Sequence, residues 1–158
     1  MEKITYRGDE IMLFANGKAM ALATSCSLEV TTNTIDARTK DSARGADTEF
    51  DNISWTSSSE SFVGANKGVT AQTLADDLLD LQIAGQPVTL TFGRITRTSS
   101  AMGESGWIAP TAADENNVLT PRTGKAWIKS VSVNAPVEGK STVSVQFEGI
   151  GELTKIGA

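Results

Sequence analysis

The side chains best suited to chemistry are few, and they lack the partners that catalysis would require. Cys26 is the only cysteine, and the chain contains no histidine. A nucleophilic thiol and a Ser-His-Asp hydrolase both need an imidazole, so both are excluded, as is a His-ligated metal site. Cys26 begins a strand-like run, and a small buried hydrophobe is its expected role.

A cluster of carboxylates invites comparison with a cation site. Asp76, Asp77 and Asp80 fall in a helical pattern, and Asp76 and Asp80 share one helix face. Their spacing is not that of a calcium-binding loop, which draws alternate ligands from an extended segment around a glycine. We expect a solvated polar face here and no metal site.

Two further motifs are weak candidates for ligand binding. Gly139-Lys140-Ser141 matches the end of a phosphate-binding loop, but Asn134 stands where that motif needs its first glycine, and no helix follows. We therefore expect no catalytic residue and no cofactor. Three tryptophans would suit a sugar-stacking platform, although core or interface anchors are their commoner role: Trp55, Trp107 and Trp127.

Length and charge limit the remaining classes of function. The 158 residues fit one domain, and 39% of them are hydrophobic, which leaves room for apolar surface that is buried only between subunits. The formal net charge is −5. Acidity disfavours specific nucleic-acid binding and suits a surface that nucleic acid slides past, although ordinary solubility would also explain it. No signal peptide and no apolar run of about 20 residues is visible, so we expect no membrane anchor.

Alternation with a period of two dominates the chain and predicts strands. Asn16-Gly17 lies between two apolar runs and predicts a hairpin turn. Further strands are predicted over residues 26–33, 52–64, 87–97, 125–133 and 141–148. In the strand at 125–133, Trp127, Val131 and Val133 are expected to oppose Ala126 and Ile128.

One helix is predicted over residues 70–84, where Leu74, Leu78 and Leu81 recur at helical spacing. Gly85 fits the position just beyond its end. Two weakly patterned segments, about 34–51 and 99–124, are predicted to be long loops. The fold is therefore expected to be mainly β, a β-sandwich or small barrel of about seven or eight strands with one mid-chain α-helix packed against it. The expected apolar anchors are Trp55, Leu74, Leu78, Phe92, Trp127 and Phe147.

An ordered set of segments spanning almost the whole chain resembles a known family. The segments are residues 16–30 (NGKAMALATSCSLEV), 33–36 (NTID) with 39–42 (TKDS), the Trp55 strand with the Leu-rich helix and 85–88 (GQPV), 124–128 (GKAWI) with 130–137 (SVSVNAPV), and 147–153 (FEGIGEL). Through these segments the chain resembles phage tail tube proteins of the TP901-1 major tail protein kind.

The resemblance implies a single tail-tube-like domain over 1–158 that works by assembly. Copies would form hexameric rings whose inner strands join into one barrel, and the rings would stack into a hollow conduit for DNA. The implied partners are copies of the chain, the tape measure and the tail terminator, while DNA would pass through the lumen without specific binding. The protein would be assembled in the bacterial host cytoplasm and reside in the virion tail.

The resemblance places two functional surfaces on this sequence. The 34–51 loop would reach the next ring, and the lumen would be lined by Ser, Thr and acidic groups. The loop carries both signs of charge, so complementary pairs would fix the register of stacked subunits: Asp36, Arg38, Lys40, Asp41, Arg44 and Asp47. The alternative is an Ig-like β-sandwich module that binds a carbohydrate or a cell surface through its tryptophans.

Overall fold

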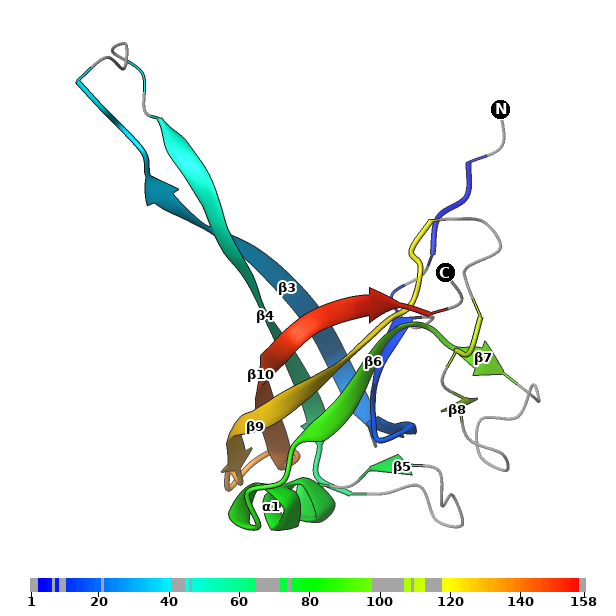
Figure 1. The fold of residues 1–158 in the computed structure, drawn as a ribbon. Coiled ribbons are helices and arrows are strands. Elements are labelled where there is room, and N and C mark those ends of the chain that lie inside the picture. Colours follow the sequence, from blue (N-terminus) through cyan, green and yellow to red (C-terminus); the bar gives the residue numbers. More distant parts are fainter. Residues whose placement is uncertain are drawn as a thin grey trace.

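The computed structural model describes residues 3–6, 8, 11–20, 22–40, 45, 47–64, 72–73, 75–97, 107–108, 110–112 and 118–156. The elements, in chain order, are β1 (Ile11–Ala15), β2 (Lys18–Met20), β3 (Ala23–Asp36), β4 (Thr48–Phe62), β5 (Gln72–Thr73), α1 (Ala75–Ile83), β6 (Val88–Arg94), β7 (Thr96–Arg97), β8 (Trp107–Ile108), β9 (Arg122–Asn134) and β10 (Thr142–Lys155). Figure 1 shows their arrangement.

Eight of the strands form one curled sheet in the order β3-β4-β10-β9-β6-β1-β2-β5, and β7 pairs with β8 separately. Pairing is antiparallel except between β2 and β5. The sheet curls into a half-barrel, with α1 beside β9 (Figure 1). The prediction of a mainly β fold with about seven or eight strands and one helix is confirmed.

The predicted hairpin turn at Asn16-Gly17 joins β1 to β2. Both residues have positive φ, 52° and 80°, as a two-residue turn of the hairpin-compatible hand requires. Asn16 also ties the turn to β6, because its backbone N–H donates to the Thr89 carbonyl at 2.8 Å and its Oδ1 accepts from the Thr89 N–H at 3.0 Å. The turn therefore holds β1 in register with β6.

The helix ends where the sequence predicts and begins later. Gly85 has a φ of +68°, its N–H donates to the Gln82 carbonyl, and the Gln86 N–H donates to the Leu81 carbonyl, which is the paired pattern of a glycine-terminated helix. The predicted start at residue 70 was wrong. Residues 72–73 form β5 beside β2, so tertiary pairing overrides helix propensity there.

The larger of two apolar clusters covers one face of the sheet, and a second, of Met12, Phe14, Ala19 and Ile95, lies on the other face of β1. Leu78 of α1 packs in a cluster with side chains from β1, β4, β6, β9 and β10. In β10 the predicted inward residues are all buried, namely Val143, Val145 and Phe147. β10 thus presents alternate residues to the core, as a half-buried strand requires, whereas β1 is buried on both faces.

The predicted faces of β9 were partly wrong. Ala126 and Ile128 are buried, and Trp127 is 47% exposed on the opposite face. Val131, however, pairs with Val145 and packs against the core. A bulge near Lys129 explains the difference, because the register shifts there by one residue and exchanges the two faces.

The two predicted loops are shorter than expected. β3 continues to Asp36 and β4 starts at Thr48, so only residues 37–47 connect them. The polar sequence of this region pairs as strands because both of its faces are exposed, which removes the apolar alternation used for prediction. In the second loop, β8 occupies residues 107–108 and β9 begins at Arg122, while most of residues 98–117 lie outside the described part.

Candidate functional site

A long two-stranded arm projects from the sheet. β3 and β4 have 14 and 15 residues, against about 5–6 in a typical strand. β10 pairs with β4 only between Thr56 and Phe62, so residues 48–55 of β4 pair with β3 alone. We call the arm the part formed by residues 30–36 and 48–55 with the connection 37–47. It leaves the half-barrel at a steep angle (Figure 1).

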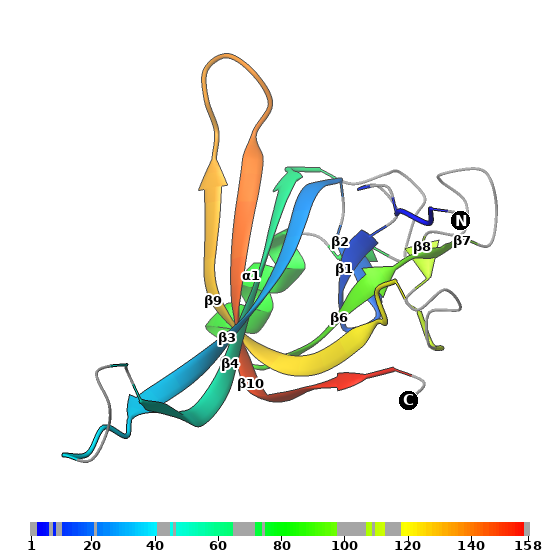
Figure 2. The same ribbon diagram turned by 90° about the horizontal axis from the view of Figure 1, so that it is seen from above.

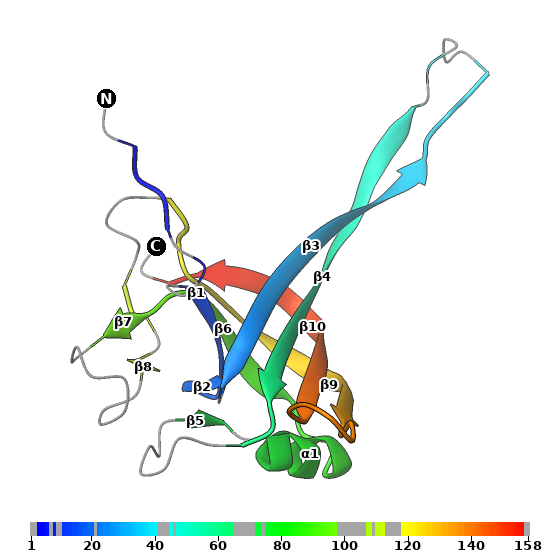
Figure 3. The same cartoon turned by 180° about the vertical axis from the view of Figure 1, so that it is seen from behind.

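β3 forms an open margin of the sheet. It is the first strand in the sheet order, and no described strand pairs with its outer side (Figure 3). β3 lacks proline, and its only charged residues are Glu29 and Asp36. Monomeric proteins usually block a long edge with charges, proline or a covering element. An unblocked edge of this length is a ready template for another strand.

The predicted charged residues gather where the arm ends, as far as the structure describes them. Asp36, Arg38, Lys40 and Asp47 all lie in or beside the connection, and all are exposed. The Arg38 N–H donates to Asp36 Oδ1 at 2.9 Å, and its Nη2 donates to the Gly45 carbonyl at 3.3 Å. The other two predicted members, Asp41 and Arg44, lie outside the described residues.

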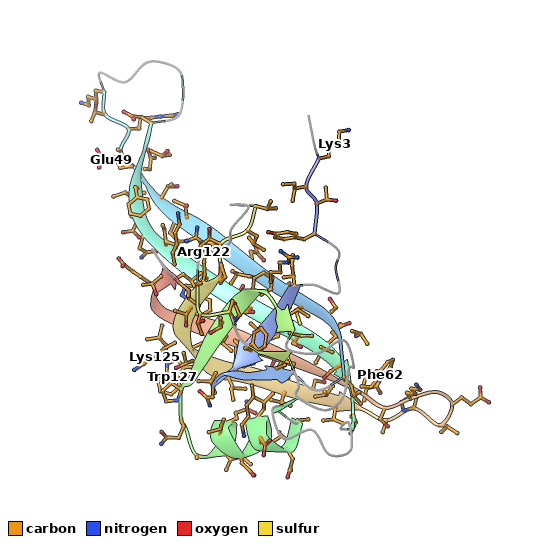
Figure 4. The ribbon with its side chains drawn as sticks, turned by 90° about the vertical axis from the view of Figure 1, so that its right-hand side faces the viewer. Lys3, Glu49, Phe62, Arg122, Lys125 and Trp127 are labelled. Carbon is orange, nitrogen blue, oxygen red and sulfur yellow. The ribbon has the colours of Figure 1, made fainter. Side chains whose placement is uncertain are left out.

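The sheet face opposite the core is polar across four adjacent strands. Paired residues point to the same side of a sheet, so the register assembles this polar face from alternate residues of β3, β4, β10 and β9. Its acidic members are Glu29, Glu60 and Glu148, and Lys125 lies at its far end beside Trp127 (Figure 4). Its other polar members are Ser25, Ser27, Thr31, Asn33, Asn52, Ser54, Thr56, Ser58, Ser130, Ser132, Asn134, Thr142, Ser144 and Gln146, and the apolar Phe62 and Ile150 lie at its ends.

Hydrogen bonds between neighbouring strands order this polar face. Ser27 and Ser58 share a hydroxyl hydrogen bond, and the Asn33 side chain donates to that of Asn52. Alternate serines of β4 turn inward instead, and Ser57 donates its hydroxyl to the Ser27 carbonyl at 2.7 Å. Of the five β4 serines, Ser54 and Ser58 thus lie on the polar face, and Ser57, Ser59 and Ser61 are buried.

Trp55 stands where the arm separates from β10. It is 3% exposed, and its indole N–H donates to the Gly151 carbonyl at 3.1 Å. A Cβ added at Gly149 would lie 2.2 Å from the indole, and one at Gly124 would lie 2.8 Å from it. The two glycines thus leave the space that the ring occupies.

The predicted apolar anchors fall into different environments. Trp55, Leu78 and Phe147 are buried, Phe92 is half-buried, and Leu74 lies outside the described residues. Trp127 is exposed within one copy, so an anchoring role for it stays a prediction that only a partner surface would fulfil.

Sequence reasoning missed an apolar strip on the arm. The strip comprises Val30, Phe50 and Ile53, which are 51%, 63% and 54% exposed. The register Val30↔Trp55, Thr32↔Ile53 and Thr34↔Phe50 sets all three on the sheet face that continues the core. Isolated apolar residues inside a polar segment were the available signal for such a surface.

The side chains that could bind a metal or act as a nucleophile are either not grouped together or partly buried. Within the described ranges, no three His, Cys, Asp or Glu side chains are grouped to hold a metal ion. Burial raises the pKa of the Cys26 thiol, whose Sγ lies 3.8 Å from Met12 Sδ and 3.9 Å from Ser59 Oγ. In the part of the chain that the structure covers, no helix has the length and apolar character to cross a membrane.

Comparison with known proteins supports the fold at low sequence identity. No protein-family model and no curated protein matches the sequence, so the resemblance to the TP901-1 family stays a prediction. Solved structures that are similar over nearly the whole chain include three assemblies. A chain of the virion of a native gene transfer agent (GTA) particle has a TM-score of 0.67 at 11% identity, covering 97% of this chain and 100% of that one.

The other two are also assemblies. A chain of the tail of an empty GTA particle, which has C6 symmetry, gives a TM-score of 0.66 at 12% identity, with 97% and 100% coverage. The SPP1 tail tube gives 0.63 at 12% identity, covering 98% of this chain and 80% of that chain. At such identities the likeness establishes a shared fold.

Proposed function

We propose that this chain is the structural subunit of a phage-type tail tube, in which hexameric rings stack into a hollow conduit for DNA. The observation that carries the proposal is the open 14-residue edge of β3, which borders a continuous polar sheet face. The fold shared with the SPP1 tail tube and with the C6-symmetric GTA tail supports it. No residue of the proposal acts as a catalyst.

Ring closure would follow from strand pairing between copies. The four-stranded polar region has two margins, β3 on one side and residues 127–134 of β9 on the other. β6 pairs with β9 only from Arg122 to Ala126, so it leaves the second margin without a strand partner among the described elements. Pairing β3 of one copy with this margin of the next would satisfy both edges, and a closed ring would leave neither exposed.

The polar face would then line the lumen. Its serine, threonine and amide groups bind water, and Glu29, Glu60 and Glu148 repel phosphates. DNA sliding past such a wall would release few counterions, and counterion release is the main source of nonspecific affinity. The face is thus suited to conduct DNA without holding it.

The charged end of the arm would contact the adjacent ring. Exposed ion pairs contribute only about 0–1 kcal/mol each, so Arg38 and its neighbours would mainly fix register and orientation. Stacking energy would come from buried apolar area, for which the apolar strip of the arm is available. The tape measure and the tail terminator would be the other partners, within a virion tail assembled in the bacterial host cytoplasm.

Electron microscopy of the purified protein, with analytical ultracentrifugation over a range of concentrations, tests the proposal. We expect rings or tubes with sixfold averages and a sedimentation profile that shifts with concentration. A monodisperse monomer at every concentration would reject it. Glycan binding by such a monomer would favour the carbohydrate-binding alternative, although Trp55 is buried and unavailable for stacking.

A further inference from the structure

A cleft opens between the arm and the end of β10. Its volume is about 470 Å³, and it is lined by residues 50–53 of β4 and 151–153 of β10. Phe50 and Ile53 are more than half exposed within it, and Leu153 packs against the core at its inner side. The cleft therefore offers exposed apolar side chains next to the body of the sheet.

Bulges on both strands hold the cleft open. In β4, Asp51 is left between the pairs Asn33↔Asn52 and Thr34↔Phe50. In β10, the register with β9 shifts between Ile150 and Thr154, so residues 151–153 oppose a single residue, Gly124. The indole of Trp55 occupies the junction and bonds to Gly151. Because bulges bend strands and end their pairing, these strands cannot close on each other here.

The complementary element lies at the other end of the same molecule. The connection between β9 and β10 projects away from the body on a different side from the arm (Figures 2 and 4). We call residues 133–141 the tip. Val137 of the tip is fully exposed and Val133 is 52% exposed. The tip also carries Lys140, opposite in charge to Asp51 and Glu152 of the cleft, together with one acid, Glu138.

We propose that the cleft of one copy receives the tip of a second copy, in the adjacent ring. This inference rests on the proposed function and names the surface that would bury the apolar strip. A contact between opposite ends of identical copies is heterologous, so it propagates along one direction instead of closing a dimer. Val137 enters the cleft against Phe50 and Ile53, and Lys140 approaches the acidic rim.

Engineered disulfides test the contact. In a Cys26→Ala background, Ile53→Cys is combined with Val137→Cys, and the matched control combines Ser54→Cys with Val137→Cys. Ser54 is adjacent to Ile53 but lies on the opposite face of β4. A disulfide forms only when the two Cα atoms approach within about 7 Å. We expect oxidation of assembled protein to give a ladder of three or more linked copies from the first pair and none from the control.

A second variant measures the contribution of the contact. Val137 is fully exposed, so Val137→Asp should leave the monomer folded, as circular dichroism would check. It should raise the concentration needed for assembly by roughly tenfold or more, as loss of one buried valine implies.

The outcomes separate the two proposals. Tubes that form normally, but give no ladder or equal ladders from both cysteine pairs, overturn the tip-in-cleft contact and leave the tail tube proposal standing. Unchanged assembly of Val137→Asp also overturns the contact. A wild-type protein that never assembles overturns both proposals.

Discussion

The substitution Gly149→Ala tests the packing that sets the arm. Its Cβ would lie 2.2–2.4 Å from three atoms of the Trp55 indole, closer than a carbon can approach, and Trp55 is 3% exposed with its N–H bonded to Gly151. The smaller conformational entropy of an unfolded chain with alanine would stabilise by about 0.4–1 kcal/mol. Overpacking costs about 1–3 kcal/mol, and displacing the indole also breaks a hydrogen bond worth about 1 kcal/mol.

The cost of the steric overlap exceeds the entropic gain, so we expect a net loss of about 2–3 kcal/mol in the free energy of unfolding. With a urea m-value of about 2 kcal/mol/M, the unfolding midpoint falls by about 1–1.5 M. Circular dichroism measures the midpoint. Gly8→Ala, whose Cβ would meet nothing within 4 Å, is the matched control and should move it little.

A double-mutant cycle isolates the cause. In a Trp55→Leu background the added methyl group has space, so Gly149→Ala should cost less than about 0.5 kcal/mol there, giving a coupling energy above about 1.5 kcal/mol. The Gly149→Ala single variant should also assemble poorly, because displacement of Trp55 changes the angle at which the arm leaves the sheet. If Gly149→Ala lowered the free energy of unfolding equally in the wild-type and Trp55→Leu backgrounds, the clash with the Trp55 indole would not be the cause.

Three further predictions concern the proposed interfaces and the buried thiol. Arg38→Glu combined with Arg44→Glu should block tube growth and leave the monomer folded, as sedimentation and circular dichroism would report; normal tubes would remove the charged end of the arm from the mechanism. Glu29→Lys combined with Glu148→Lys should make assembled tubes retain DNA at low salt and release it at high salt, because the lumen becomes basic; filter binding measures this. Burial raises the pKa of the Cys26 thiol above 9.0, so the thiol of the unfolded chain loses its proton at a lower pH than that of the folded chain. The free energy of unfolding should therefore fall as pH rises past 9.0, and Cys26→Ala should reduce that fall.

Local signals in the sequence were sufficient wherever chain neighbours decide the structure. Asn16-Gly17 sets its own turn, and Gly85 ends α1 through bonds to residues within five positions. The start of α1 depended on a distant partner, since β2 captures residues 72–73 as a strand. The expected long loop at 34–51 failed for a related reason. Apolar alternation reports burial of one face, and beyond Trp55 the arm buries neither face in a single copy.

The polar and charged composition of the segment predicted part of the candidate site, but the sequence did not predict where its residues lie in the fold. Polarity and charge singled out the segment containing Asp36, Arg38, Lys40 and Asp47, and the structure gathers these residues at the end of the arm. The apolar strip was not predicted, because Phe50 fell in the expected loop while Val30 and Ile53 fell in expected strands, and only the pairing shows that β10 does not extend along them. A residue's exposure in a sheet depends on where neighbouring strands stop.

The bulges explain why the sequence pattern does not show where β10 stops pairing with β4. A bulge shifts one strand against its partner, so its position is a property of the pair, and neither strand alone encodes it. Three shifts lie near the junction of the arm, at Asp51, at Lys129 and at residues 151–153. Together they turn Trp127 away from the core, expose the strip and separate β4 from β10. Deleting Asp51 should therefore make Asn33↔Asn52 and Thr34↔Phe50 consecutive pairs, which removes the bulge and its bend while Phe50 stays opposite Thr34 on the face of the strip. Assembly would then fail even though the strip and every charged residue at the end of the arm remained, which separates the role of the bend from the roles of the strip and the charges.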